Sequence, residues 1–303
     1  MTSPTGRTFE IGYGDARAVV EERGATLRSY DVGDRRLLDP MAGEPPPPRS
    51  SRGEVLLPWP NRVVDGRWSW RGTDYQLALT EPERGHALHG LVRDLAWTLV
   101  DSEPARVVLE VLLLARPGWP FPLRSRAAYD VSAAGLTVSV TTSNVGAEPV
   151  PYGVAAHPYL ALPGGRVDDA TLDLPAGSYV ETDERLAPVA RHPTAGTAAA
   201  FTAAEPIGTR RADTAFTDLP RRPDGAAVAT LRAADGVTTL LWGDESVRWW
   251  QVFTGDGLPV PWRRQSVAVE PMSCGPDALN TGEDLVVLDP GGSHTMRWGL
   301  TLF

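Results

Sequence analysis

Residues 67–80 read RWSWRGTDYQLALT, a stretch in which apolar and polar residues alternate on both sides of a turn. The turn is predicted at Arg71-Gly72-Thr73, because glycine tolerates the left-handed backbone of tight hairpin turns. The alternating apolar residues are Trp68, Trp70, Tyr75, Leu77 and Leu79. A period of two puts such residues on one face of a strand. The stretch therefore predicts a β-hairpin with one buried face.

The same pattern recurs further along the chain. Residues 127–144 predict a second hairpin, with its turn at Ala133-Ala134-Gly135. Residues 295–302 alternate in the same way and predict a terminal strand. A continuous apolar run at residues 107–115 favours a strand buried on both faces, although a short helix also fits its composition.

Turn-forming residues punctuate the whole chain, which contains 30 glycines and 28 prolines. No long amphipathic helix, fixed-period repeat or linker between regions of different composition is visible. We therefore expect an all-β protein, folded as a single domain over residues 1–303 into a two-sheet sandwich of many strands. The Ala-, Thr- and Pro-rich residues 187–206 are expected to form a surface excursion.

Composition excludes several classes of function. The formal charge of −9 opposes nucleic-acid binding, which requires a basic surface. The sequence contains no lysine, so a Schiff-base lysine, a pyridoxal phosphate anchor and a Walker-type phosphate lysine are all excluded. The single cysteine, Cys274, can form neither an intrachain disulfide nor a multi-cysteine metal site.

No apolar run is long enough for a membrane helix, and residues 1–10 contain no apolar segment of a secretory signal. We therefore expect a cytoplasmic protein that does not bind membranes. The sequence specifies no oligomeric state.

Two short motifs are weak candidates for ligand sites. Gly12-Tyr13-Gly14 lacks the third glycine of a dinucleotide-binding loop and precedes a strand-like segment. His86 and His89 have a spacing that metal ligands use, but no third ligand is evident nearby, so no metal is expected. His192 and His294 have no neighbouring partner in the sequence and are expected to be exposed.

Four separated segments carry a resemblance to a known family. They are Pro60-Asn61-Arg62-Val63, His86-Ala87-Leu88-His89-Gly90, Pro151-Tyr152-Gly153 through His157-Pro158-Tyr159, and Val269-Glu270-Pro271-Met272-Ser273 with Pro276-Asp277-Ala278-Leu279-Asn280. Together, in this order, they resemble the motifs of the aldose 1-epimerase (galactose mutarotase) family. Leu91 and Leu160 depart from residues common in that family, which bears on the substrate preference.

The resemblance implies a supersandwich fold and a cofactor-free isomerase acting on a free aldohexose such as glucose or galactose. It makes His157 the general acid toward the ring oxygen and Glu270 the general base on the C1 hydroxyl. Arg62 and His89 would hold and polarise the sugar oxygens. Asp213 would bind ring hydroxyls, although an aspartate in this context caps turns equally well.

The chemistry requires such residues. Opening a cyclic hemiacetal removes the proton of the C1 hydroxyl and delivers one to the ring oxygen, so two opposed proton-transfer groups suffice. His157 suits this role because a histidine titrates near neutrality. Glu270 requires burial to raise its pKa, and its neighbours Val269 and Pro271 are apolar. Trp249, Trp250 and Phe253 lie near Gln251 in a predicted strand, and aromatic rings pack on sugars.

Two alternatives remain open at this level. A hexose-6-phosphate epimerase on the same fold would need an arginine cluster, for which Arg210-Arg211 and Arg263-Arg264 are candidates. A noncatalytic sugar-binding module is the second, and the presence of both His157 and Glu270 argues against it.

Overall fold

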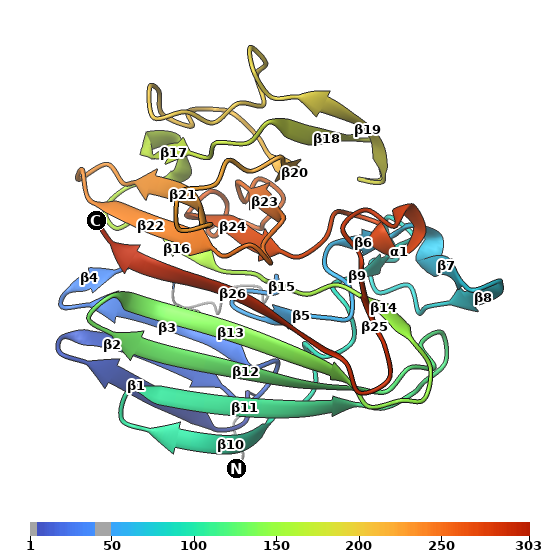
Figure 1. Cartoon of the computed structure of the whole chain (residues 1–303). Helices are drawn as coiled ribbons and strands as arrows, with labels where there is room; N and C mark the ends of the chain where they lie inside the picture. Colours follow the sequence, from blue (N-terminus) through green and yellow to red (C-terminus); the bar gives the residue numbers. More distant parts are fainter. Residues whose placement is uncertain (1–4, 40–49) are drawn as a thin grey trace.

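The computed structural model describes residues 5–39 and 50–303, and these residues are almost entirely β-structure. The described helical segments are the short helix α1 (Ala278–Thr281) and two 3-10 segments, η1 (Val64–Gly66) and η2 (Val167–Asp169). No helix in the described part of the chain has the length and apolar character needed to cross a bilayer. The predicted all-β class is confirmed (Figure 1).

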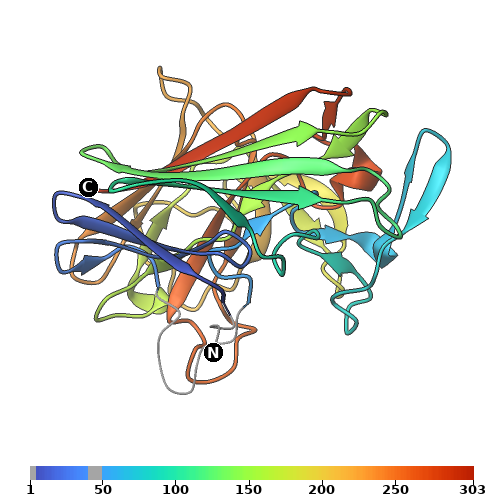
Figure 2. The same cartoon turned by 90° about the horizontal axis from the view of Figure 1, so that it is seen from below.

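The largest layer is an antiparallel sheet of eight strands, which runs from the lower edge of the molecule in Figure 1 into its upper half. Its strands in spatial order are β10 (Thr98–Glu103), β11 (Arg106–Leu113), β12 (Leu123–Ser132), β13 (Gly135–Asn144), β26 (Ser293–Leu302), β22 (Thr238–Gly243), β21 (Ala227–Arg232) and β17 (Thr171–Asp173). A four-stranded sheet packs against β11 and β12, as Figure 2 shows. It consists of β1 (Thr8–Tyr13), β2 (Ala16–Glu21), β3 (Thr26–Val32) and β4 (Arg35–Arg36).

A second eight-stranded sheet forms the other main layer. In order it contains β19 (Pro188–Pro193), β18 (Ser178–Thr182), β20 (Asp213–Thr217), β23 (Trp249–Phe253), β24 (Ser266–Met272), β15 (Ala155–Ala156) and β5 (Val55–Leu56), and β16 (Tyr159–Ala161) also pairs with β24. Three small ribbons complete the described strands: β6 (Arg62–Val63) with β9 (Ala87–Leu88), β7 (Arg67–Trp70) with β8 (Thr73–Gln76), and β14 (Val150–Tyr152) with β25 (Val286–Leu288).

Both predicted hairpins form. The β7–β8 turn contains two residues, Arg71 and Gly72, which both have positive φ, and Thr73 already belongs to the second strand. Such a turn matches the twist of the flanking strands. In the β12–β13 hairpin the turn is Ala133-Ala134, and Gly135 pairs with Ser132. A side chain at Gly135 would meet the carbonyl oxygen of Leu300 at 2.4 Å, so glycine is required there.

The alternating residues of the two longest predicted strands form the core. Leu136, Val138 and Val140 of β13 pair in register with Leu300, Trp298 and Met296 of β26, and all six are buried. One buried cluster extends from these strands to the other two sheets, for example to Val20 of β2 and Val269 of β24. The terminal strand is therefore a central element of the sandwich.

Three details differ from the sequence predictions. The apolar run predicted at residues 107–115 is a strand only as far as Leu113, in β11, and Leu112 is exposed because the outer face of the sheet meets solvent at this end. Residues 187–206 are not only a surface excursion: β19 pairs with β18, and Phe201 is buried in the core. His294 is not a free surface residue, since its Nδ1 lies 2.6 Å from the hydroxyl of Tyr152.

Two leucines on the same face of β26 provide a test of this packing. Leu300 is fully buried, whereas Leu302 is 37% exposed. We expect Leu300→Ala to lower the free energy of unfolding by about 2–5 kcal/mol, the cost of a cavity in a closely packed core. Leu302→Ala should cost less than about 1 kcal/mol. Urea denaturation of both variants measures the difference, and equal losses would contradict the burial described here.

Candidate active site

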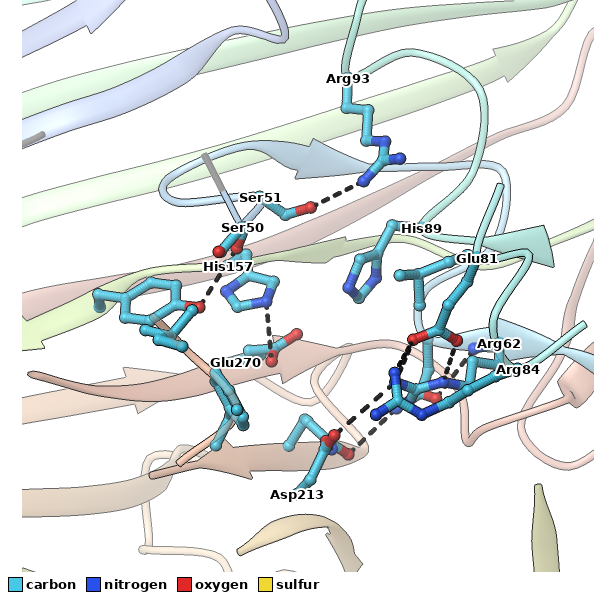
Figure 3. Close-up of a pocket in the computed structure, with 17 residues that line it drawn as sticks. Ser50, Ser51, Arg62, Glu81, Arg84, His89, Arg93, His157, Asp213 and Glu270 are labelled. Carbon is cyan, nitrogen blue, oxygen red and sulfur yellow. Dashed lines mark hydrogen bonds and ion pairs between the residues drawn. The ribbon is translucent and has the colours of Figure 1, made fainter. Parts of the chain in front are cut away.

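A pocket of about 240 Å³ opens on the face of the second eight-stranded sheet (Figure 3). All five residues predicted from the sequence line it: Arg62, His89, His157, Asp213 and Glu270. They come from segments far apart in the chain. Asp213 and Glu270 lie on strands of this sheet and His157 lies between two of its strands, whereas Arg62 and His89 come from the separate β6–β9 ribbon.

Glu270 lies on β24, a strand buried on both faces. Val267 and Val269 point into the core, and the alternate residues Ala268 and Glu270 face the pocket side. A carboxyl group on such a strand has lost most of its contact with water, which disfavours its charged form. Burial therefore raises the pKa of Glu270 well above its usual value, and the neighbouring Asp213 raises it further.

His157 is held opposite Glu270 by two strands that pair with β24. Ala155 of β15 pairs with Met272 and Tyr159 of β16 pairs with Ala268, so the residue between them lies beside Glu270. His157 Nε2 is 3.2 Å from Glu270 Oε1. Pro158, which favours an extended backbone before it, accepts a hydrogen bond from the amide of Val269.

The imidazole of His157 is almost completely buried. Burial lowers its pKa to about 3, and the positive charges of Arg52 and Arg93 act in the same direction. Because the pKa of His157 falls and that of Glu270 rises, the pair carries one exchangeable proton between the two groups over a wide pH range.

His89 follows β9 in a left-handed conformation, with φ of 61°. Its amide donates to the carbonyl of Asn61 at 2.9 Å. The next residue, Gly90, must be glycine, because a Cβ atom there would lie 2.1 Å from the carbonyl oxygen of Leu57. The ring meets that of His157 edge-on, with centroids 5.3 Å apart. Burial lowers the pKa of His89 well below its usual value, and the neighbouring His157 and Arg93 act in the same direction.

Arg62 is the centre of a buried ion network. Its Nε and Nη2 donate to the two carboxylate oxygens of Glu81 at 2.7 and 3.0 Å, and Nη2 lies 3.7 Å from Asp213. Arg84 donates to Glu81 as well, at 2.6 Å. Although burial opposes the effect, the bonds from Arg62 lower the pKa of Glu81. The network fixes the guanidinium beside Glu270, as Figure 3 shows.

Sequence reasoning missed the polar chain that orients Asp213. Asn61 donates to Gln251 Oε1 at 3.1 Å, and Gln251 donates to Asp213 Oδ1 at 2.6 Å. Gln251 also pairs in register with Glu270 across β23 and β24. A glutamine within the apolar run Trp249 to Phe253 was the available signal. Asp213 is thus a pocket residue at the start of β20, and it does not cap a turn.

Other pocket residues had no distinctive signal in the sequence. They are Glu81, Arg84, Arg93, Ser50 and Ser51. Two aromatic residues that the sequence did single out, Tyr159 in a motif segment and Phe253 in the predicted aromatic strand, also line the pocket. Trp249 and Trp250 are fully buried, and no tryptophan is found among the described residues that line the pocket. The aromatic surface available to a ligand is therefore that of Tyr159 and Phe253.

The remaining candidates lie outside the pocket. His86 is buried, with its two ring nitrogens against the amide of Asp65 and the carbonyl of Arg185, which is a structural role. None of the four arginines proposed for a phosphate lines the pocket. Arg264 pairs with Asp168 and Asp256, and Arg210 pairs with Glu205.

The Arg62–Glu81 ion pair can be tested by its effect on stability. Glu81→Ala leaves the buried guanidinium of Arg62 without its main partner, so we expect a loss of about 3–5 kcal/mol in the free energy of unfolding. Glu110→Ala removes a more exposed partner of Arg126 and should cost less than about 1 kcal/mol. Urea denaturation provides both values, and a Glu81→Ala loss as small as the control would show that Arg62 does not depend on this pair.

Comparison with known proteins identifies the family of this chain. The family model for aldose 1-epimerase matches residues 7–301. The uncharacterized protein YihR of Escherichia coli is 32% identical, over 98% of this chain and 93% of its own length.

Solved structures show the same fold. The GalM/aldose epimerase homologue of C. elegans superimposes with a TM-score of 0.85 at 17% identity, covering 98% of this chain and 99% of its own. A galactose mutarotase-like protein of Clostridium acetobutylicum gives 0.83 at 14% identity, covering 98% and 95%. The predicted galactose mutarotase-like sandwich is confirmed. Because the family model spans nearly the whole sequence, the chain belongs to the aldose 1-epimerase family.

Proposed function

We propose that this protein is a mutarotase that interconverts the α and β anomers of a free aldohexose such as glucose or galactose. The observation that carries the proposal is the contact of 3.2 Å between His157 Nε2 and Glu270 Oε1 in the floor of the pocket. The two oxygens that exchange protons in this reaction are bonded to the same carbon atom. A donor and an acceptor that lie side by side can therefore reach both at once.

Ring opening follows from this arrangement. Glu270 accepts the proton of the C1 hydroxyl, His157 donates a proton to the ring oxygen, and the bond between C1 and the ring oxygen breaks. The product is the open-chain aldehyde. Rotation about the C1–C2 bond presents the other face of the carbonyl, and closure reverses both proton transfers to give the second anomer.

The charge of the catalytic pair stays constant during the reaction. The pKa directions favour an imidazole beside a carboxylic acid as the resting form. Transfer of the shared proton from Glu270 to His157 gives the imidazolium and carboxylate that ring opening uses, and opening returns the pair to its resting form. The enclosed pocket disfavours isolated charges, which is why it lowers the pKa of His157 and raises that of Glu270. One proton shared by two groups satisfies this constraint throughout.

The other pocket residues hold the sugar. Arg62 and His89 supply donors beside the pair, where negative charge develops on the C1 oxygen as it becomes a carbonyl. Asp213, oriented by Gln251, accepts from ring hydroxyls. Tyr159 and Phe253 offer apolar surface to the C–H groups of the pyranose.

The engagement of the arginines favours an uncharged sugar over a hexose 6-phosphate. Of the three arginines that line the pocket, Arg62 and Arg84 both pair with Glu81, and Arg93 donates to Ser51. The arginine pairs suggested by the sequence for a phosphate are engaged elsewhere. A noncatalytic sugar-binding module is disfavoured as well, since binding alone requires no contact between a buried acid and base.

Substitution of the pair tests the proposal. We expect His157→Ala and Glu270→Ala each to lower kcat for mutarotation by at least about 100-fold, because each removes a positioned proton-transfer group. Polarimetry of freshly dissolved α-D-glucose and α-D-galactose measures the rate against a buffer blank. His192→Ala is the control, because His192 contacts Glu181 outside the pocket and should keep the wild-type rate.

Circular dichroism of each variant tests whether it is folded. A folded His157→Ala or Glu270→Ala variant with the wild-type rate would remove that residue from the mechanism. Activity of the wild type on glucose 6-phosphate alone would replace the free-sugar assignment with the phosphorylated class.

The pH dependence provides a separate test. If an essential histidine has its usual pKa of about 6.5, kcat/KM falls as the pH drops below that value. This fall is the acid limb of the pH profile. The pKa of His157 is lowered to about 3, so the pair gains a second, inhibitory proton only in strong acid. We expect kcat/KM to stay within about twofold from about pH 7 to about pH 5. An inflection near 6.5 that depends on His157 would contradict this.

A further inference from the structure

Arg52 lies behind the pocket, and its side chain is only 2% exposed. It precedes β5 and is not among the residues that line the pocket. Its Nη1 donates to Asp39 at 2.5 Å and to Ser266 at 3.2 Å. Its Nε and Nη2 have no hydrogen-bond partner among the described residues. A buried guanidinium with unused donors is costly, so its position requires a compensating role.

Arg52 contacts the ring of Tyr159, on which His157 also stacks. The Cζ atom of Arg52 is 3.9 Å from the ring centroid of Tyr159. The imidazole of His157 stacks on that same ring, with centroids 5.1 Å apart and planes 8° from parallel. The hydroxyl of Tyr159 donates to the carbonyl of Ser50, which fixes the far end of the ring. One aromatic ring thus carries both the guanidinium and the imidazole.

This arrangement gives His157 a positive neighbour that cannot be neutralised by deprotonation, since arginine remains charged at all relevant pH values. Asp39 balances Arg52 at one nitrogen, on the side of Ser266. Other titratable and charged groups face the pair from the surrounding elements. Those around His157 are His89 after β9, Arg93, Tyr159 and Arg52, and those around Glu270 are Arg62 on β6 and Asp213 on β20. Burial has the largest effect on the pKa of His157. Of the two arginines, Arg52 lowers this pKa more than Arg93 does.

We propose that Arg52 is a positioning residue for the proton-transfer pair, which fixes the plane of His157 through the ring of Tyr159 and maintains a permanent positive charge behind it. The kinetic part of this proposal rests on the mutarotase function proposed above. Positive charge at this point opposes a second proton on the pair. It therefore keeps His157 ready to receive the proton that the reaction returns, even in mild acid.

Two substitutions separate charge from packing. Arg52→Met keeps the buried aliphatic volume and removes the charge, so the acid limb of kcat/KM should move to higher pH by about one unit. At neutral pH the misaligned imidazole should lower kcat by about tenfold, with little change in KM. Arg52→Lys keeps the charge and should leave the acid limb near its wild-type position.

The control is a second buried arginine. Arg264 pairs with Asp168 and Asp256 away from His157, so Arg264→Met should lower stability without moving the acid limb. If Arg52→Met does not fold, Arg52→Gln repeats the neutral substitution with a side chain that can still bond to Ser266. An unmoved limb in the folded neutral variants, or an equal shift in Arg264→Met, would overturn the proposal.

A readout without substrate distinguishes failure of this proposal from failure of the proposed function. NMR titration of the His157 ring, assigned from the spectrum of His157→Gln, measures its pKa directly. The ring should titrate at a higher pH in Arg52→Met than in the wild type and in Arg52→Lys. Absence of mutarotation in the wild type would refute the proposed function alone. Identical titration in Arg52→Met and the wild type would refute the role of Arg52, whatever the enzyme catalyses.

Discussion

The structure depends on one buried contact, that between the imidazole of His157 and the carboxyl group of Glu270. A carboxyl group on a strand buried on both faces is costly unless its surroundings compensate it. Here β15 and β16 both pair with β24, and this pairing holds the histidine at the required position beside the acid. The fold thereby replaces two separate charges with a pair that shares one proton.

The rest of the pocket protects that pair. Arg62 is held by Glu81 in a network that supplies positive charge next to Glu270 but remains balanced by carboxylates. Gln251 links Asn61 to Asp213 and lies opposite Glu270 in the sheet. Arg52 stacks on the ring that also supports His157. Each of these groups is fixed by a strand or by another side chain, so little reorganisation is needed when a sugar enters.

The alternation of apolar and polar residues along the sequence was sufficient to predict several of the strands. The alternation at residues 67–80, 127–144 and 295–302 specified strands, because a period of two is a property of the strand itself. The five candidate site residues came from motifs and do line one pocket. The contacts of Gln251 and Arg52 arise only when distant strands pair, so the sequence showed at most that a glutamine interrupts the apolar run at residues 249–253. The same is true of β19, whose partner β18 decides that residues 188–193 are a strand.

The central claim is that His157 and Glu270 act on two oxygens of one carbon atom. The most direct test is a crystal structure of the Glu270→Gln variant with D-galactose or D-glucose bound. We expect the C1 hydroxyl within hydrogen-bond distance of the side chain at position 270 and the ring oxygen within that distance of His157 Nε2. A sugar bound with C1 remote from both residues, or with the two oxygens exchanged, would contradict the account.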